Sequence, residues 1–183
     1  DDWYIMHDVE LMNHIGSHIE VPYHYFKDGD DLSDISLERL IGEASIIDIT
    51  HKGPKEAISR AELEEMDPDL RAGDMALFNT GYSKYWGTEK YTEAAYLAND
   101  AIRWLVDKDV KLVGSDSWGL QNPYVAKKEE EKDTHQLLLG RGILILENVA
   151  NLDHLSKERV FVFCLPISIK NIDSFPVRMI AFE

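Results

Sequence analysis

Cysteine is almost absent from this chain of 183 residues, whose only thiol belongs to Cys164. A single cysteine cannot form an intrachain disulfide, and it excludes a metal site built from several thiolates. Because Cys164 lies inside an apolar run, we expect a small buried core residue. No apolar stretch approaches the roughly 20 residues that a membrane-spanning helix needs, so we expect no membrane partner.

Basic side chains are also scarce, since 19 Lys and Arg stand against 34 Asp and Glu and give a formal net charge of -15. Such a surface repels phosphates, and we therefore predict neither nucleic acid nor an anionic membrane as a partner. The length suits one domain with a substantial core, so we predict a single domain over residues 1–183. We also expect a cytoplasmic location. The sequence opens with Asp1 rather than Met, and we expect N-terminal residues to be missing.

The most informative stretch is residues 13–25, which read NHIGSHIEVPYHY. Its even positions hold His14, His18, Glu20 and His24, while most odd positions are apolar. This period-two alternation predicts a strand with one polar face. A lone histidine is more often structural than a ligand, but packing poorly explains a face with so many polar groups, because buried polar groups need partners. Imidazoles and a carboxylate are ligands that zinc accepts, so the stretch predicts a metal site.

A flat strand would keep two of these histidines apart. Residues four apart on such a strand are separated by roughly 13 Å, because the rise is about 3.3 Å per residue. His14 and His18 could hardly share one ion over that span. We therefore predict a bulge or sharp bend near Gly16, the residue type that tolerates one at least cost.

Strands and helices alternate along the rest of the chain without strict βαβ regularity. Apolar runs predict strands at residues 44–50, 75–79, 110–114, 143–147, 160–165 and 177–182, and helical patterns lie at 37–41, 96–107 and from 127 to the glycine at 140. Ser59 followed by Glu62 is a capping-box pattern that predicts a helix ending near Met66. We therefore predict an α/β fold with a mixed sheet or partial barrel and helices packed outside.

Two later residues are candidates for the same site. His135 begins a short predicted helix, and Glu147 closes the apolar run ILIL. A carboxylate is unexpected there unless it meets a cation or a hydrogen-bond donor. Nothing local in the sequence shows that these two residues meet the motif at 13–25.

Residues 14–24 closely resemble the signature HxGTHxDxPxH of the metal-dependent cyclase family, which contains bacterial kynurenine formamidase and isatin hydrolase. Ser17 replaces the Thr of that signature and keeps its hydroxyl. Glu20 replaces its Asp, which moves the carboxylate by the length of one C–C bond, roughly 1.5 Å. The resemblance spans nearly the whole chain, and its other segments are Gly73-Asp74, Thr80-Gly81, Val113-Gly114-Ser115-Asp116, His135 and Glu147-Asn148. The usual opening strand of the family is not present.

The resemblance implies a compact swivelling β/β/α-type fold and a homodimer or larger homo-oligomer. The metal ligands that it implies are His14, His18 and Glu20 for a first ion, and His135 and Glu147 for a second, with Glu20 as the bridge. It implies that His24 is the catalytic acid/base, and it places Asp116 as a candidate near the site. Zinc is the expected divalent ion and manganese the alternative, with one or two ions per chain.

These features together predict a metal-dependent hydrolase that cleaves an amide, formamide or lactam C–N bond with metal-activated water. The expected substrate is a small molecule, and the aromatic candidates for its pocket are Trp3, Tyr4, Tyr23, Tyr25 and Trp86. Two alternatives stay open. One is a cyclase or dehydratase acting on a small carbonyl substrate, and the other is a non-catalytic metal-binding protein in which Glu20 has spoiled the site.

Overall fold

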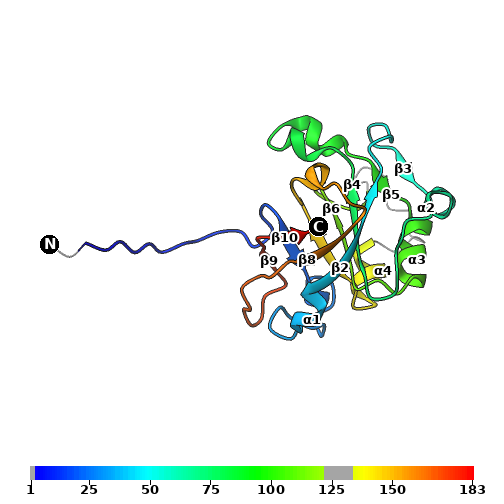
Figure 1. The fold of residues 1–183 in the computed structure, drawn as a ribbon. Coiled ribbons are helices and arrows are strands. Elements are labelled where there is room, and N and C mark those ends of the chain that lie inside the picture. Colours follow the sequence, from blue (N-terminus) through cyan, green and yellow to red (C-terminus); the bar gives the residue numbers. More distant parts are fainter. Residues whose placement is uncertain (1–2, 122–133) are drawn as a thin grey trace.

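The computed structural model describes residues 3–121 and 134–183, so the predicted helix start at 127–133 lies outside the described residues. Within them, eight strands form one curled mixed sheet in the order β10-β8-β2-β4-β6-β7-β1-β9 (Figure 1). The strands of this sheet are β1 (His18–Glu20), β2 (Ile41–Asp48), β4 (Met75–Asn79), β6 (Leu112–Ser115), β7 (Leu144–Glu147), β8 (Arg159–Phe163), β9 (Ser174–Pro176) and β10 (Ile180–Phe182). A small second sheet pairs β3 (Ala57–Ile58) in parallel with β5 (Tyr96–Leu97).

The middle of the large sheet is parallel, through the pairs β2–β4, β4–β6 and β6–β7. Strands β4, β6 and β7 are buried along their whole length, which is why they read as mainly apolar runs. In β4, Met75 and Leu77 enter one core cluster while Ala76 and Phe78 enter the other. Strands β8, β10, β1 and β9 extend the sheet on its two sides through antiparallel pairs.

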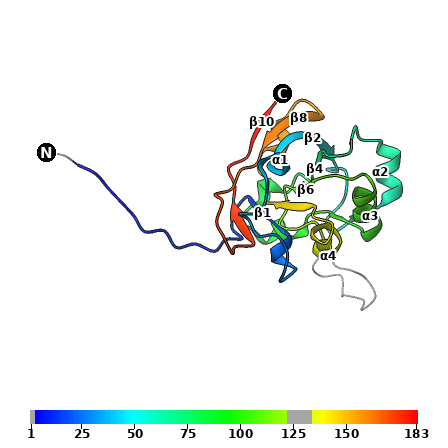
Figure 2. The same cartoon turned by 90° about the horizontal axis from the view of Figure 1, so that it is seen from below.

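The longer helices of the described chain cover one face of the sheet. The helices are α1 (Leu37–Leu40), α2 (Arg60–Met66), α3 (Asn99–Asp107) and α4 (Thr134–Leu139), and the shorter 3-10 helices are η1 (Pro22–His24), η2 (Ser83–Tyr85), η3 (Glu89–Glu93) and η4 (Leu152–His154). Helices α2, α3 and α4 lie together on one side (Figure 2) and contribute Leu63, Leu105 and Leu138 to the core cluster that contains Phe78. On the other face, apolar side chains from the C-terminal segment 172–181 pack over the sheet. This arrangement confirms the predicted mixed sheet with helices packed outside.

Several local predictions can be compared with the structure. The capping box is confirmed, because the Ser59 side chain accepts a hydrogen bond from the Glu62 N–H and the Glu62 carboxylate accepts one from the Ser59 N–H. Cys164 is fully buried, as predicted. The helix predicted over 96–107 begins only at Asn99, because the two residues of β5 pair with β3 instead.

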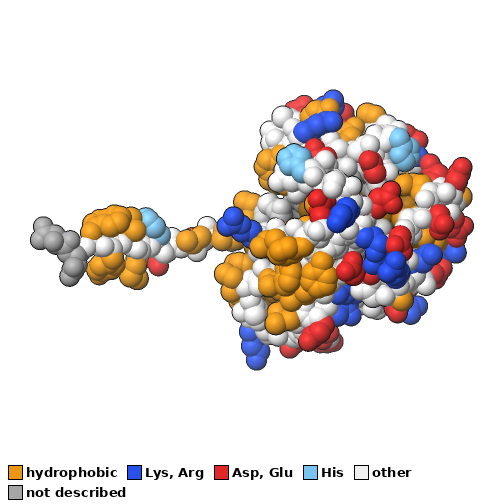
Figure 3. Space-filling view, viewed as in Figure 1, with side chains coloured by type: hydrophobic (Ala, Val, Ile, Leu, Met, Phe, Trp, Pro, Cys, Tyr) orange, Lys and Arg blue, Asp and Glu red, His pale blue; other side chains and the backbone are white. Residues whose placement is uncertain are grey.

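Residues 3–12 form an extended segment without helix or strand that projects from the body of the protein (Figures 1 and 3). Its apolar side chains are exposed, with Trp3 at 83% and Tyr4 at 82% of their full accessibility. These two aromatic residues therefore do not contribute to the cavity described below. None of the described helices has the length and apolarity needed to cross a membrane.

Candidate metal centre

Two of the predicted ligands belong to β1 and a third lies across from them on β7. His18 and Glu20 are two residues apart, so their side chains share one face of the strand. The antiparallel register places His18 directly opposite Glu147. His18 Nε2 lies 3.5 Å from Glu20 Oε1 and 3.7 Å from Glu147 Oε2. All three side chains are buried, at 2%, 3% and 8% exposure respectively.

Gly16 brings His14 back to this group. Its φ of +61° lies in the left-handed region, which glycine adopts at little cost. The predicted bend at Gly16 is therefore confirmed, and His14 Nδ1 lies 3.0 Å from Glu20 Oε1. The Gly16 carbonyl also accepts a hydrogen bond of 2.8 Å from His18 Nδ1, which leaves His18 Nε2 facing the carboxylates.

The polar strand predicted over residues 13–25 is confirmed only at His18–Glu20 and is wrong on both sides of it. Pro22 has no N–H to donate to a sheet, and the chain turns into η1 at that residue. This turn places His24 beside the other histidines, with its Nε2 3.9 Å from Glu20 Oε1. The rings of His14 and His24 have centroids 4.5 Å apart.

The second half of the predicted site reaches the same place. His135, from the first turn of α4, has its Nε2 3.2 Å from Glu20 Oε2. Glu20 thus contacts His14 with one carboxylate oxygen and His135 with the other. The structure therefore gathers the predicted ligands and the predicted acid/base, namely His14, His18, Glu20, His24, His135 and Glu147. Their individual roles as ligands or as acid/base stay predictions.

The chemistry of this cluster suits a divalent cation. Two groups of described residues each bring their potential ligand atoms within 4.8 Å of one another. One group is His14, Glu20 and His24, and the other is His18, Glu20 and Glu147. His18 Nε2 is buried without a hydrogen-bond partner in the part of the chain that the structure describes. A buried ring nitrogen that faces carboxylates in this way has the surroundings of a metal ligand.

The charges in the cluster are strongly coupled. Burial and the nearby charge of Glu20 raise the pKa of the Glu147 carboxyl above its usual range. Burial also acts to raise the pKa of Glu20, but the neighbouring imidazoles of His135, His14 and His18 outweigh it and hold that pKa low. The hydrogen bond to Glu20 raises the pKa of His14 to about 9. Two buried carboxylates thus attract positive charge to one point, as a cation site requires.

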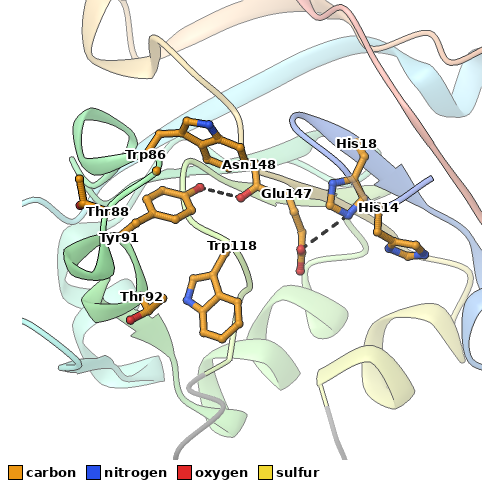
Figure 4. A pocket seen from close by; sticks show the side chains of 10 residues that line it. His14, His18, Trp86, Thr88, Tyr91, Thr92, Trp118, Glu147 and Asn148 are labelled. Atoms are coloured by element: carbon orange, nitrogen blue, oxygen red, sulfur yellow. Dashed lines mark hydrogen bonds and ion pairs between the residues drawn. The ribbon is translucent and has the colours of Figure 1, made fainter. Parts of the chain in front are cut away.

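A cavity of about 530 Å³ opens beside the cluster. His14, His18 and Glu147 line one side, and aromatic rings of Trp86, Tyr91 and Trp118 line the other (Figure 4). Trp86 is thus the one residue from the predicted aromatic set that lines this cavity. Trp118, 38% exposed, was not predicted, since no periodic pattern surrounds it.

Hydrogen bonds tie the walls of the cavity to the motif. Asn148 Oδ1 accepts a hydrogen bond of 2.6 Å from the Tyr91 hydroxyl, and Asn148 Nδ2 donates to the Gly16 carbonyl at 3.2 Å. Asp116 is buried and accepts hydrogen bonds from the backbone N–H groups of Thr80 and Tyr82 at 2.8 and 3.1 Å. Asp116 therefore anchors the start of the loop that carries Trp86.

Sequence reasoning missed Asp173, which immediately precedes β9. Its Oδ2 lies 2.9 Å from His14 Nε2 and 2.7 Å from His24 Nδ1. The residues that follow Asp173 form the three-residue strand Ser174–Pro176, which is too short to show an alternating pattern in the sequence. The contact depends on β9 pairing with β1, which no local pattern predicts.

The chain is similar to several known proteins. A family model described as "Putative cyclase" matches residues 2–122. The kynurenine formamidase of Bacillus cereus is 30% identical over 168 residues, which are 91% of this chain and 75% of that protein. The kynurenine formamidase of Delftia acidovorans is 28% identical over 172 residues, covering 94% and 77%.

Solved structures with the same fold include a "Potential Metal-Dependent Hydrolase With Cyclase Activity", which is 28% identical, has a TM-score of 0.79 and matches 94% of this chain and 80% of that one. An isatin hydrolase bound to the product analogue thioisatinate has a TM-score of 0.85 at 23% identity, over 94% of this chain and 72% of that one. At that identity the second likeness shows the fold alone.

Proposed function

Because this chain belongs to the cyclase family, we propose that it is a metal-dependent hydrolase that cleaves the C–N bond of an amide, formamide or lactam. The observation that carries this proposal is the convergence of His18 and Glu20 with Glu147 from the other half of the chain. The names of its relatives support it, since they include kynurenine formamidases and a metal-dependent hydrolase.

We propose that the metal ligands are His14, His18, Glu20, His135 and Glu147, with zinc as the first candidate and manganese as the second. Imidazole and carboxylate ligands are acceptable to both ions. Glu20 lies between the other ligands and would be shared if two ions bind. A divalent ion held there would lower the pKa of a water molecule and withdraw electrons from the carbonyl to be attacked.

His24 is the proposed acid/base. Its Nδ1 is engaged by Asp173, so its Nε2 is the nitrogen that faces Glu20 and the centre. At that nitrogen His24 can accept a proton from the attacking water and deliver it to the departing nitrogen of the substrate. Its side chain is 30% exposed, which leaves room for a substrate to approach.

The proposed substrate carries an aromatic ring. Trp86, Tyr91 and Trp118 face the candidate ligands across the cavity, at a position where a ring could stack while its amide or formamide group reaches His18 and Glu147. Aromatic contacts of this kind contribute about 0.5–1.5 kcal/mol of binding free energy in addition to the energy gained by burying their surface. N-formylkynurenine and isatin, which the names of the relatives suggest, are therefore the first compounds to test.

The test is hydrolysis of N-formylkynurenine, isatin and small lactones by protein stripped with EDTA and then reloaded with zinc or manganese. We expect turnover of at least one substrate only after reloading, and its loss in Glu147→Gln. His51→Ala is the matched control, because His51 is an exposed histidine in a turn outside the cluster. Metal-loaded protein that cleaves none of these compounds would contradict the proposal.

His24→Ala separates the two roles that its position allows, since His24 lies in one of the potential ligand sets. We expect the variant to bind zinc as the wild type does while kcat falls by about 10²–10⁴-fold, the usual contribution of a general acid or base. Loss of zinc together with activity would make His24 a ligand instead.

A further inference from the structure

The backbone at Asp173 is fixed to the metal-binding motif. Strand β9 runs antiparallel to β1, with Ser174 opposite Glu20 and Pro176 opposite His18. One residue earlier, the Asp173 carbonyl accepts a hydrogen bond of 3.0 Å from the Val21 N–H. The carboxylate of Asp173 therefore enters the site from a paired backbone.

The contacts of this carboxylate use both of its oxygens. Oδ2 lies 2.9 Å from His14 Nε2 and 2.7 Å from His24 Nδ1, and Oδ1 accepts a hydrogen bond of 2.6 Å from Asn13 Nδ2. An ionised carboxylate can only accept hydrogen bonds, so each ring nitrogen that faces it is the donor.

Fixing one nitrogen of an imidazole as a donor determines what the other can do. In His14 the remaining nitrogen is Nδ1, 3.0 Å from Glu20 Oε1, and in His24 it is Nε2, 3.9 Å from the same oxygen. A carboxylate behind a metal-binding histidine commonly holds the ring orientation and tautomer in this way. Here one carboxylate does so for two rings at once.

We propose that Asp173 is a positioning residue that holds His14 Nδ1 and His24 Nε2 toward the metal centre. The inference rests on the proposed function of that centre, but it concerns the orientation of the rings and can be measured without any substrate. Asn13 completes the arrangement by holding the second oxygen of Asp173.

The experiment compares the wild type with Asp173→Asn and Asp173→Ala in three measurements. These are zinc affinity by competition with a chelator, the tautomer of His24 by ¹⁵N NMR with and without zinc, and kcat and KM on any substrate found. Asp31→Asn is the matched control. Asp31 is also buried and accepts a hydrogen bond of 2.6 Å from the Asn171 N–H of the same segment, yet it contacts no histidine in the described part of the chain.

We expect both Asp173 variants to bind zinc about 10–100-fold more weakly and to lose kcat in a similar range, with KM little changed. The His24 signal should shift away from the tautomer protonated at Nδ1. Asp31→Asn should leave zinc affinity and the His24 tautomer as in the wild type. If the Asp173 variants are unfolded, Asn13→Ala provides a milder loss of the same orientation and should weaken zinc binding in the same direction.

Wild-type zinc affinity together with an unchanged His24 tautomer in Asp173→Asn would overturn the inference, whatever the enzyme cleaves. Equal losses in Asp173→Asn and Asp31→Asn would also overturn it, because they would assign the effect to the segment rather than to the carboxylate. Zinc binding without hydrolysis by the wild type would instead refute the proposed function and leave the orientation measurements valid.

Discussion

His18 and Glu147 are direct partners across the antiparallel β1–β7 pair, with His18 Nε2 3.7 Å from Glu147 Oε2. The ladder between the two strands, rather than a loop, sets this separation. Sites held by regular elements keep their geometry more accurately than sites on loops. The centre is therefore largely formed before a cation arrives, and its charges must be balanced in the protein without metal.

Metal-free protein should lose stability as the pH rises. Burial and the charge of Glu20 raise the pKa of Glu147 above its usual 4.5, and the hydrogen bond to Glu20 raises that of His14 from 6.5 to about 9. A group whose pKa is raised in the folded state stabilises the fold in full at pH values below its unfolded-state pKa. This contribution is lost as the pH rises through its folded-state pKa. The melting temperature of EDTA-treated protein should thus fall from about pH 5 to about pH 9.

Adding zinc should reverse this loss. At a free concentration of about 100 times its Kd, a ligand raises the free energy of unfolding by about 2.7 kcal/mol. For a chain of this size, that raises the melting temperature by roughly 5–10 °C. Glu147→Gln removes one of the titrating groups and should flatten the pH dependence measured in EDTA. A melting temperature that rises over this pH range in EDTA would show that the coupled charges are assigned incorrectly.

Glu20→Asp should damage the site even though the cyclase signature carries Asp. Glu20 Oε1 lies 3.0 Å from His14 Nδ1, and Glu20 Oε2 lies 3.2 Å from His135 Nε2. Removal of one methylene withdraws the carboxylate by roughly 1.5 Å, so it cannot keep both. We expect kcat/KM to fall by about 100-fold, the typical effect of such a misplacement.

The control for this change is Glu65→Asp on the exposed side of α2, which should leave activity unaltered. Measured zinc stoichiometry would show whether the shorter side chain also loses an ion. Equal or higher kcat/KM in Glu20→Asp would mean that the backbone adjusts and that the side-chain length is not limiting.

Trp86→Ala and Trp118→Ala should weaken binding of aromatic substrates. Both rings line the cavity beside His18 and Glu147. We expect KM to rise by up to about tenfold for an aryl formamide, in line with an aromatic contact of about 0.5–1.5 kcal/mol, and to change little for a small aliphatic formamide. Trp3→Ala, in the extended N-terminal segment, is the control. Equal changes for both substrates would argue against stacking.

Asp116→Ala should destabilise the fold and loosen the cavity wall. The Asp116 carboxylate is 1% exposed and accepts hydrogen bonds from the N–H groups of Thr80, Tyr82 and Ser83. Leaving these donors without an acceptor should lower the free energy of unfolding by about 3 kcal/mol or more, measured by urea titration. Asp116→Asn keeps one acceptor oxygen, so its free energy of unfolding should fall less than that of Asp116→Ala. Equal losses in the two variants would mean that the negative charge of Asp116 is what stabilises the loop.

Ser59→Ala should cost about 1 kcal/mol of unfolding free energy, because it removes the capping box of α2. Ser36→Ala is a matched control. Ser36 occupies the same position before α1 but its side chain makes no capping hydrogen bond. Equal losses in the two variants would show that helix propensity, rather than the cap, determines the difference.

The sequence predicted best those features that depend on neighbours along the chain. The apolar run at 75–79 is a strand buried on both faces, and the Ser59–Glu62 pair caps a helix. The bend at Gly16 also follows from a local argument, since two histidines cannot share an ion across a flat strand. Alternation misled us at Pro22, where the polar period of two continues through His24 but the backbone has already turned into η1.

Long-range pairing limited the rest. His135 and Glu147 were linked to the motif only through a family resemblance, because nothing in their own segments indicates that β7 pairs with β1. Asp173 escaped notice for the same reason. Strand β9 has three residues, and its partner lies at the other end of the chain.

The position of the short strand β1 between β7 and β9 affects the order in which the site can form during synthesis. Its three residues are held between β7 and β9, both of which are made late in synthesis. A growing chain on the ribosome thus presents His14, His18 and Glu20 long before Glu147 and Asp173 exist. Contacts between such distant segments form slowly. A cation captured early would meet half a binding site, and tight capture must wait until β7 and β9 have been made and have paired with β1.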